Sequence, residues 1–246
     1  MQLLAALKLH ALIDKQCHAS CYDGLRQNQV SYTRYLHQNI YDFQKKQLLA
    51  PKESVVLSEG IFSMSGYQPE LSALSTHYPL IVDEAHAFGV LGQHGLGATH
   101  KAQLTQEKVP LRIIPFGKAM GGFGAVVAGD KLWIKALLQA ARPLIYSTAI
   151  SPALAHGLLS AFRALIEAND ERAKLHENIN YFRHCIDTSP LKWSSSNTPI
   201  QQLQLGCPKQ AIQYSTFLKT QDIICLPMRP PTVSVQHTGL RIVLSA

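Results

Sequence analysis

Residues 111–129 read Leu-Arg-Ile-Ile-Pro-Phe-Gly-Lys-Ala-Met-Gly-Gly-Phe-Gly-Ala-Val-Val-Ala-Gly. Two apolar runs, Leu111–Pro115 and Ala125–Ala128, flank a glycine-rich turn and predict two strands joined by that turn. Lys118 is the charged residue of the turn, and we expect it to be held among apolar residues. Desolvation favours a neutral amine, which is a nucleophile able to form a Schiff base with an aldehyde.

Two phosphate-binding loops do not fit these residues. A P-loop requires a glycine where Arg112 stands and a serine or threonine after the lysine, where Ala119 stands. The dinucleotide-binding pattern lacks its third glycine. From this segment alone, a surface lysine in a tight hairpin remains an open alternative.

A second segment, Tyr78–Gly92, adds a carboxylate to the lysine. Leu80–Val82 predicts a short buried strand, and Asp83 stands at its C-terminal end. Ligands of open α/β sheets bind beyond the carboxyl ends of the strands. An aspartate there, with a lysine after the next strand, suits pyridoxal 5'-phosphate (PLP), whose pyridine nitrogen needs an acidic partner. Taken singly, Asp83 is equally suited to capping a helix, and His86 to a core position.

Composition bounds the class of protein. The 246 residues are 46% hydrophobic and 16% charged, which is typical of a globular chain. The net charge of +7 is not organised into a basic stripe with aromatics, so we expect no nucleic-acid partner. Five scattered cysteines favour a cytoplasmic protein, and Cys17-His-Ala-Ser-Cys21 lacks the second pair of a metal site. No apolar run is long enough to predict a membrane span.

Strands and helices alternate along the first two thirds of the chain, which predicts a mostly parallel sheet flanked by helices. We expect this α/β domain over residues 1–168 and a small α+β domain over residues 169–246. The expected strands are Ser31–Tyr35, Ser54–Leu57, Leu80–Val82, Leu111–Pro115, Ala125–Ala128, Thr198–Leu205, Ile223–Leu226 and Leu240–Leu244. The expected helices are Met1–Ile13, Ile40–Leu49, Pro69–His77, Ala98–Lys108, Lys131–Ala141, a long segment over 152–184 and Gln210–Lys219, with Arg142–Thr148 extended.

Several short motifs together resemble one enzyme family. They are, in chain order, Cys17-His-Ala-Ser20, Asp83-Glu-Ala-His86, Phe116-Gly-Lys118, Tyr146-Ser-Thr148 and Arg229-Pro-Pro-Thr-Val233. This order is similar to that in the α-oxoamine synthases, which are fold-type I PLP-dependent transferases. The run after Arg229, followed by Leu240–Ala246, resembles the biotin-pathway branch of the family. The resemblance covers essentially the whole chain.

The resemblance implies a role for each matching residue. Lys118 would bind the cofactor and move the substrate's α-proton, and Asp83 would partner the pyridine nitrogen. His86 and Ser63 would contact the phenolic oxygen, while His18 would stack on the ring. Two further roles complete the set: Thr148 would reach the phosphate in a neighbouring subunit of a homodimer, and Arg241 would bind the substrate carboxylate. From the residues alone, His18 as a helix cap, Ser63 as a turn serine and Arg241 as an edge-strand charge remain alternatives.

The implied reaction is a decarboxylative condensation of L-alanine with pimeloyl-CoA, or with pimeloyl-ACP, to give 8-amino-7-oxononanoate. Alternatives within the resemblance are a relative that uses glycine with a shorter acyl-CoA, and an inactive fragment that keeps the motifs. The chain differs from the family at Pro115, where a threonine is usual, and at Ser65, where an aspartate is usual. The resemblance also implies an N-terminal truncation, because members carry further segments before the point that matches Met1.

Overall fold

The computed structural model describes all residues from Met1 to Ala246. The chain divides into two compact units. The first unit comprises Met1–Ile61 and Pro69–Ala168, and the second comprises Phe62–Gln68 and Asn169–Ala246. The second unit thus includes a short segment from within the range 1–168 that we expected to form one domain.

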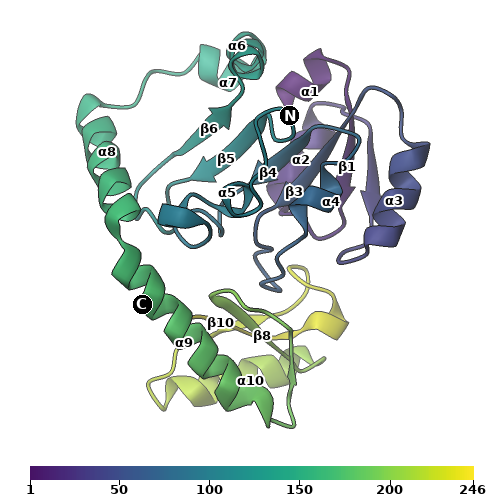
Figure 1. The fold of residues 1–246 in the computed structure, drawn as a ribbon. Helices are drawn as coiled ribbons and strands as arrows, with labels where there is room; N and C mark the ends of the chain where they lie inside the picture. The colour runs from purple at the N-terminus through teal and green to yellow at the C-terminus, as the bar shows by residue number, and fades with distance from the viewer. The chain divides into compact units, whose positions relative to one another are not determined.

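The first unit is built on a six-stranded sheet in the order β2-β1-β3-β4-β5-β6 (Figure 1). The first five strands of that order are mutually parallel, and β6 runs antiparallel to β5 at one edge. The strands are β1 (His10–Asp14), β2 (Tyr32–Tyr35), β3 (Ser54–Glu59), β4 (Leu80–Asp83), β5 (Leu111–Pro115) and β6 (Ala125–Gly129). The expected mostly parallel sheet flanked by helices is therefore confirmed.

Helices flank this sheet (Figure 1). They are α1 (Gln2–Ala6), α2 (Ala19–Gln27), α3 (Ile40–Leu49), α4 (Leu71–Leu74), α5 (Ala98–Lys101), α6 (Lys131–Ala140), α7 (Arg142–Ile145) and α8 (Pro152–Glu167), with a 3-10 turn, η1, at Gln93–Gly95. All six residues of β3 are buried, which is expected for a parallel strand covered on both faces. Leu158 and Leu165 of α8 pack with Ile114 of β5.

The second unit contains a four-stranded antiparallel sheet in the order β7-β8-β10-β9. Its strands are β7 (Lys192–Trp193), β8 (Ile200–Gln204), β9 (Leu226–Met228) and β10 (Gly239–Val243), and its helices are α9 (Asn169–Asp187) and α10 (Pro208–Lys219), with a 3-10 turn, η2, at Val235–His237. Leu203, Cys225 and Leu240 form the centre of its core. No helix of the chain is both long and apolar enough to cross a membrane.

Six expected elements were wrong in whole or in part. The helix expected over Pro69–His77 spans only Leu71–Leu74, the helix expected over Ala98–Lys108 ends at Lys101, and the strand expected over Ile223–Leu226 lies instead at Leu226–Met228. The helix expected over Met1–Ile13 ends at Ala6, and His10–Asp14 forms β1 between β2 and β3. A short apolar run does not distinguish a buried strand from a buried helix, so pairing with neighbouring strands decides the outcome. Arg142–Ile145 is a helical turn rather than extended, because Pro143 in its first turn suits a helix start. The long segment is broken at Ala168, between α8 and α9.

Candidate active site

Acidic side chains end three neighbouring parallel strands of the first unit. Asp14 ends β1, Glu59 ends β3 and Asp83 ends β4, with Glu59 and Asp83 directly paired in register. Parallel strands bring their carboxyl ends to one edge of the sheet. The segments that follow β1, β4 and β5 carry His18, His86 and Lys118, so this edge presents these three predicted residues together with Asp83.

Lys118 lies in a tight turn between β5 and β6. The turn is closed by hydrogen bonds from the Phe116 amide to the Gly124 carbonyl at 2.9 Å and from the Gly122 amide to the Phe116 carbonyl at 2.8 Å. Gly121 and Gly124 have φ angles of +60° and +99°, which favour glycine. The Lys118 side chain is exposed, so the expectation that apolar residues enclose it was wrong: β6 is an edge strand and leaves this side of the turn uncovered.

Asp83 is the acid whose charge interacts with that of this lysine. Burial raises the pKa of the Asp83 carboxyl, and this effect outweighs the hydrogen bond from the Ala85 amide and the positive charges of Lys118 and His18, which lower it. Asp83, Lys118 and His18 are therefore close enough for their charges to interact, and we call these three residues the electrostatic cluster. The Ala85 amide donates to Asp83 Oδ1 at 2.9 Å, so Asp83 also caps the turn that contains His86.

His18 is held through both its backbone and its ring. Its amide donates to Glu59 Oε1 at 2.6 Å, and Glu59 is buried. The ring Nδ1 accepts from the Ser20 amide at 3.3 Å and caps α2, which confirms the helix-cap alternative. The ring itself remains exposed at the carboxyl edge of the sheet, so capping does not exclude contact with a ligand.

A buried ion pair next to Asp83 was missed by the sequence analysis. Glu84 is fully buried, and its Oε1 lies 3.1 Å from Arg112 Nε and 3.0 Å from a terminal nitrogen of the same guanidinium. Glu84 also accepts the amides of Ala98 at 2.7 Å and Thr99 at 3.0 Å. The sequence signal for this ion pair was Arg112, a single charged residue inside the apolar run of β5. This pair holds the β4 end against the loop before α5.

The thiols of Cys17 and Cys21 are influenced by the acidic side chains at the strand ends. Burial raises the pKa of Cys21 to about 12, with further contributions from the charges of Asp83 and Glu59. Burial, then the charge of Glu59, raises the pKa of Cys17 as well. Both cysteines are free, and these shifts keep them as neutral thiols near neutral pH. They are therefore poor nucleophiles in spite of their position beside His18.

The other predicted residues belong to other parts of the chain. Thr148 is exposed beyond α7. Ser63 belongs to a turn of the second unit. Arg241 lies on β10, which pairs with both β8 and β9, so the edge-strand alternative was wrong. Its Nε is buried without a hydrogen-bond partner, and burial lowers the pKa of its guanidinium.

The family model for class I and II aminotransferases matches residues 1–246. The 8-amino-7-oxononanoate synthase of Marinomonas sp. (strain MWYL1) is 37% identical over 240 residues, which are 95% of this chain and 60% of that protein. The crystal structure of 8-amino-7-oxononanoate synthase from Francisella tularensis is 34% identical, with a TM-score of 0.87, over 99% of this chain and 73% of that one.

Serine palmitoyltransferase of Sphingomonas wittichii shares the fold at 24% identity, with a TM-score of 0.90 over 99% of this chain and 64% of its own. A structure of SPT with PLP matches to a similar degree. The chain spans about 60% of the length of the curated relatives it matches. Because the family model matches from the first residue to the last, the chain belongs to the class I and II aminotransferase family.

Proposed function

We propose that the chain is the core of a PLP-dependent acyltransferase that condenses L-alanine with pimeloyl-CoA or pimeloyl-ACP, with loss of carbon dioxide, to give 8-amino-7-oxononanoate. The relatives that are 34–37% identical carry the name of that synthase, which supports the choice of reaction. The observation that carries the proposal is the electrostatic interaction of Asp83, at the end of β4, with Lys118, after the neighbouring strand β5.

The donor set fits PLP. The cofactor needs an amine, an acid for its ring nitrogen and a planar group against its ring, and Lys118, Asp83 and His18 are of those types. The amine is exposed, so an aldehyde can reach it. The space beside Gly121, in the same turn as Lys118, is also open, because a Cβ at Gly121 would meet no atom within 4 Å. Pro115 offers neither a hydroxyl nor an amide hydrogen, so we expect phosphate binding to depend on other donors.

When bound, PLP would supply the electron sink that lets bonds to the substrate's α-carbon break. The carboxylate of Asp83 would keep a positive charge at the ring nitrogen, and its partial burial strengthens that interaction. Lys118 Nζ would accept the α-proton, since it stands on the same edge of the sheet as Asp83. His86 would hydrogen-bond the phenolic oxygen from the turn that Asp83 caps.

Arg241 would bind the carboxylate of the substrate amino acid. The resemblance assigns this role, and the unpaired, buried Nε of Arg241 supports it. A guanidinium remains charged at neutral pH even when its pKa is lowered, and its fork matches a carboxylate. We propose Ser63 as a further contact to the phenolic oxygen, on the resemblance alone.

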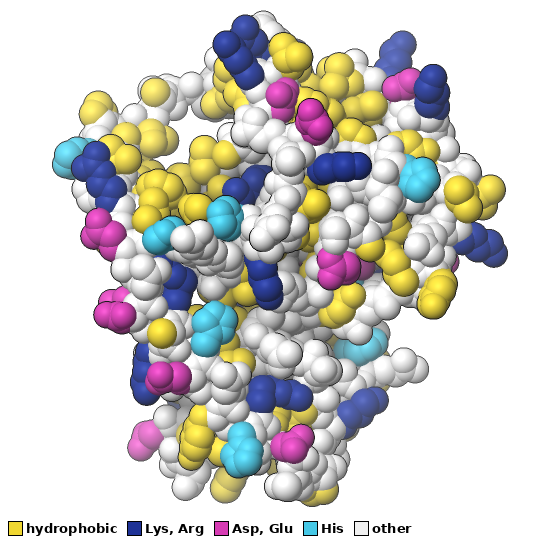
Figure 2. Space-filling model, viewed as in Figure 1, with side chains coloured by type: hydrophobic (Ala, Val, Ile, Leu, Met, Phe, Trp, Pro, Cys, Tyr) yellow, Lys and Arg dark blue, Asp and Glu magenta, His cyan; other side chains and the backbone are white.

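We further propose a cytoplasmic homodimer in which Thr148 reaches the phosphate site of the partner. Large apolar side chains are exposed around the Lys118 turn and the helices after β6: Phe123 is 78% exposed, Leu132 73% and Tyr146 74%. Figure 2 shows apolar side chains gathered on this part of the first unit. Exposed apolar patches of this kind typically mark interaction surfaces.

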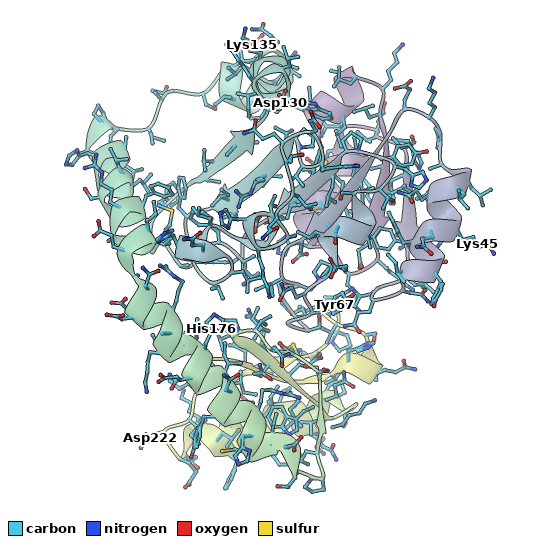
Figure 3. All side chains as sticks on the ribbon, viewed as in Figure 1. Lys45, Tyr67, Asp130, Lys135, His176 and Asp222 are labelled. Carbon is cyan, nitrogen blue, oxygen red and sulfur yellow. The ribbon has the colours of Figure 1, made fainter.

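The first experiment measures the absorbance of the purified chain with added PLP, followed by borohydride reduction and peptide mapping. We expect a new visible band and a reduced adduct on Lys118. Lys118→Ala should abolish both, whereas the control Lys135→Ala should not, because Lys135 is exposed on α6 and points outward (Figure 3). Adducts scattered over surface lysines would contradict the proposal. Turnover with L-alanine and with glycine, across acyl-CoA chain lengths, then tests the substrates.

A further inference from the structure

His37 follows β2 and contacts the acid that ends β1. Its Nδ1 lies 3.0 Å from Asp14 Oδ1, and the two side chains are only 10% and 4% exposed. The side-chain amide of Gln38 lies 3.4 Å from His37 Nε2. A carboxylate oxygen only accepts, so Nδ1 carries the hydrogen directed at Asp14. His37 is therefore oriented as a donor to a buried carboxylate.

Asp14 in turn organises the connection between β1 and α2. Its Oδ1 accepts the Gln16 amide at 2.7 Å, and its backbone carbonyl accepts the Cys17 amide at 3.0 Å and the Tyr22 hydroxyl at 2.7 Å. These bonds shape the turn over residues 14–18, which ends at His18. The His18 amide, at the end of this turn, donates to the carboxylate of Glu59.

We propose that His37 is a positioning residue for His18: it holds the Asp14 carboxylate, and the carboxylate fixes the turn that presents the His18 ring. The inference deepens the proposed function and rests on it for the contact between His18 and the cofactor. The physical reason is desolvation. A buried carboxylate that loses a donor is costly, so Asp14 would turn towards water.

The consequences should fall on the turn and not on β1. The strand is paired on both sides, with β2 and with β3, and these ladders do not involve the Asp14 side chain. Besides the bonds to Asp14 and Glu59, the turn has a bond from the Lys15 amide to the Tyr35 carbonyl at 2.9 Å and a long contact from Cys17 Sγ to the Leu57 carbonyl at 3.8 Å. Loss of the His37 donor should therefore release residues 16–18, while the Lys15 amide stays bonded to the Tyr35 carbonyl and the sheet stays intact.

The first test uses the cofactor-free chain and amide hydrogen exchange. His37→Leu removes the donor, and we expect exchange of the Gln16 and His18 amides to rise roughly tenfold or more, as expected for the loss of a hydrogen bond to a charged group. His37→Asn places an amide nitrogen at the same number of bonds as Nδ1, so it should restore slow exchange. The control His77→Leu alters an exposed histidine and should change nothing.

Unchanged exchange in His37→Leu would overturn the proposal, as would a rise that spreads through β3. If His37→Leu does not fold, Asp14→Asn provides the second variant, because its neutral side chain is a weaker acceptor for His37 and for the Gln16 amide than the carboxylate is. The same local rise in exchange is expected there, and its absence would overturn the proposal equally.

The second test is a double-mutant cycle on PLP affinity. If His37 acts through His18, then His37→Leu weakens PLP binding in the wild-type background and adds nothing in a His18→Ala background. Additive losses would show that His37 has a general structural role, and would overturn the proposal. A chain that does not bind PLP at all would refute the proposed function, while the exchange experiment would still decide whether His37 orders the turn.

Discussion

Replacing Gly66 with alanine should lower the free energy of unfolding of the second unit, because the new Cβ would collide with β8. Gly66 has a φ of +69°, and a Cβ there would lie 2.1 Å from the Ile200 carbonyl oxygen and 2.4 Å from Ser196 Oγ. The carbonyl belongs to β8 and cannot move aside. Alanine would also disturb the hydrogen bonds that the Gly66 carbonyl accepts from Ser196 at 3.2 Å and Thr198 at 3.1 Å. Left-handed backbone and overpacking together cost about 2–5 kcal/mol.

The two tryptophans make the assay specific for one unit. Trp193 lies on β7 of the second unit, where its ring meets that of Phe182 edge-on at 5.3 Å. Trp133 lies on α6 of the first unit. In a Trp133→Phe background, urea unfolding followed by tryptophan fluorescence therefore reports on the second unit.

The matched control is Gly206→Ala. Gly206 has nearly the same φ, +67°, but no atom lies within 4 Å of a Cβ built there. This variant should lose only the backbone contribution, about 1–2 kcal/mol. Equal losses in the Gly66 and Gly206 variants would refute the argument that contact with β8, rather than backbone strain, holds the segment Phe62–Gln68 in place.

Three further outcomes follow from the first unit. Glu84→Ala should cost about 3–5 kcal/mol in urea unfolding, because it leaves the guanidinium of Arg112 unpaired; a loss below about 1 kcal/mol would contradict this. Burial raises the pKa of Asp83, so its contribution favours folding below the unfolded pKa and is lost as pH rises through the raised value. Asp83→Asn should therefore be more stable than wild type at neutral pH, with the gap closing on acidification, while PLP affinity falls. Iodoacetamide at neutral pH should label the exposed Cys185 long before Cys21, whose pKa is about 12, as peptide mass spectrometry would show.

Local patterns predicted those elements whose conformation depends on their own residues. The helix expected over Ile40–Leu49 has those bounds, with Asn39 capping its first turn through the Asp42 amide. The strands on either side of Lys118 were also predicted, because glycine clusters and apolar runs are local signals. The carboxylate at the end of β4 followed from the same reasoning, and the family resemblance was confirmed by a match over the whole chain.

Local patterns failed where long-range pairing decides the structure. His10–Asp14 became a strand because β2 and β3 pair with it on both sides. The exposure of Lys118 depends on β6 being an edge strand, which no pattern within residues 111–129 reveals.

By itself, the sequence determined the family, the strand–turn–strand unit around Lys118 and the types of side chain that the candidate site contains, since motif order and local propensity are properties of the chain. Only the tertiary structure decided which side chains meet. His37 reaches Asp14 across 23 residues, and Arg112 reaches Glu84 across 28. The physical reason is that a buried charge must find its partner in space, and the strand order of the sheet, not distance along the chain, brings the partners together.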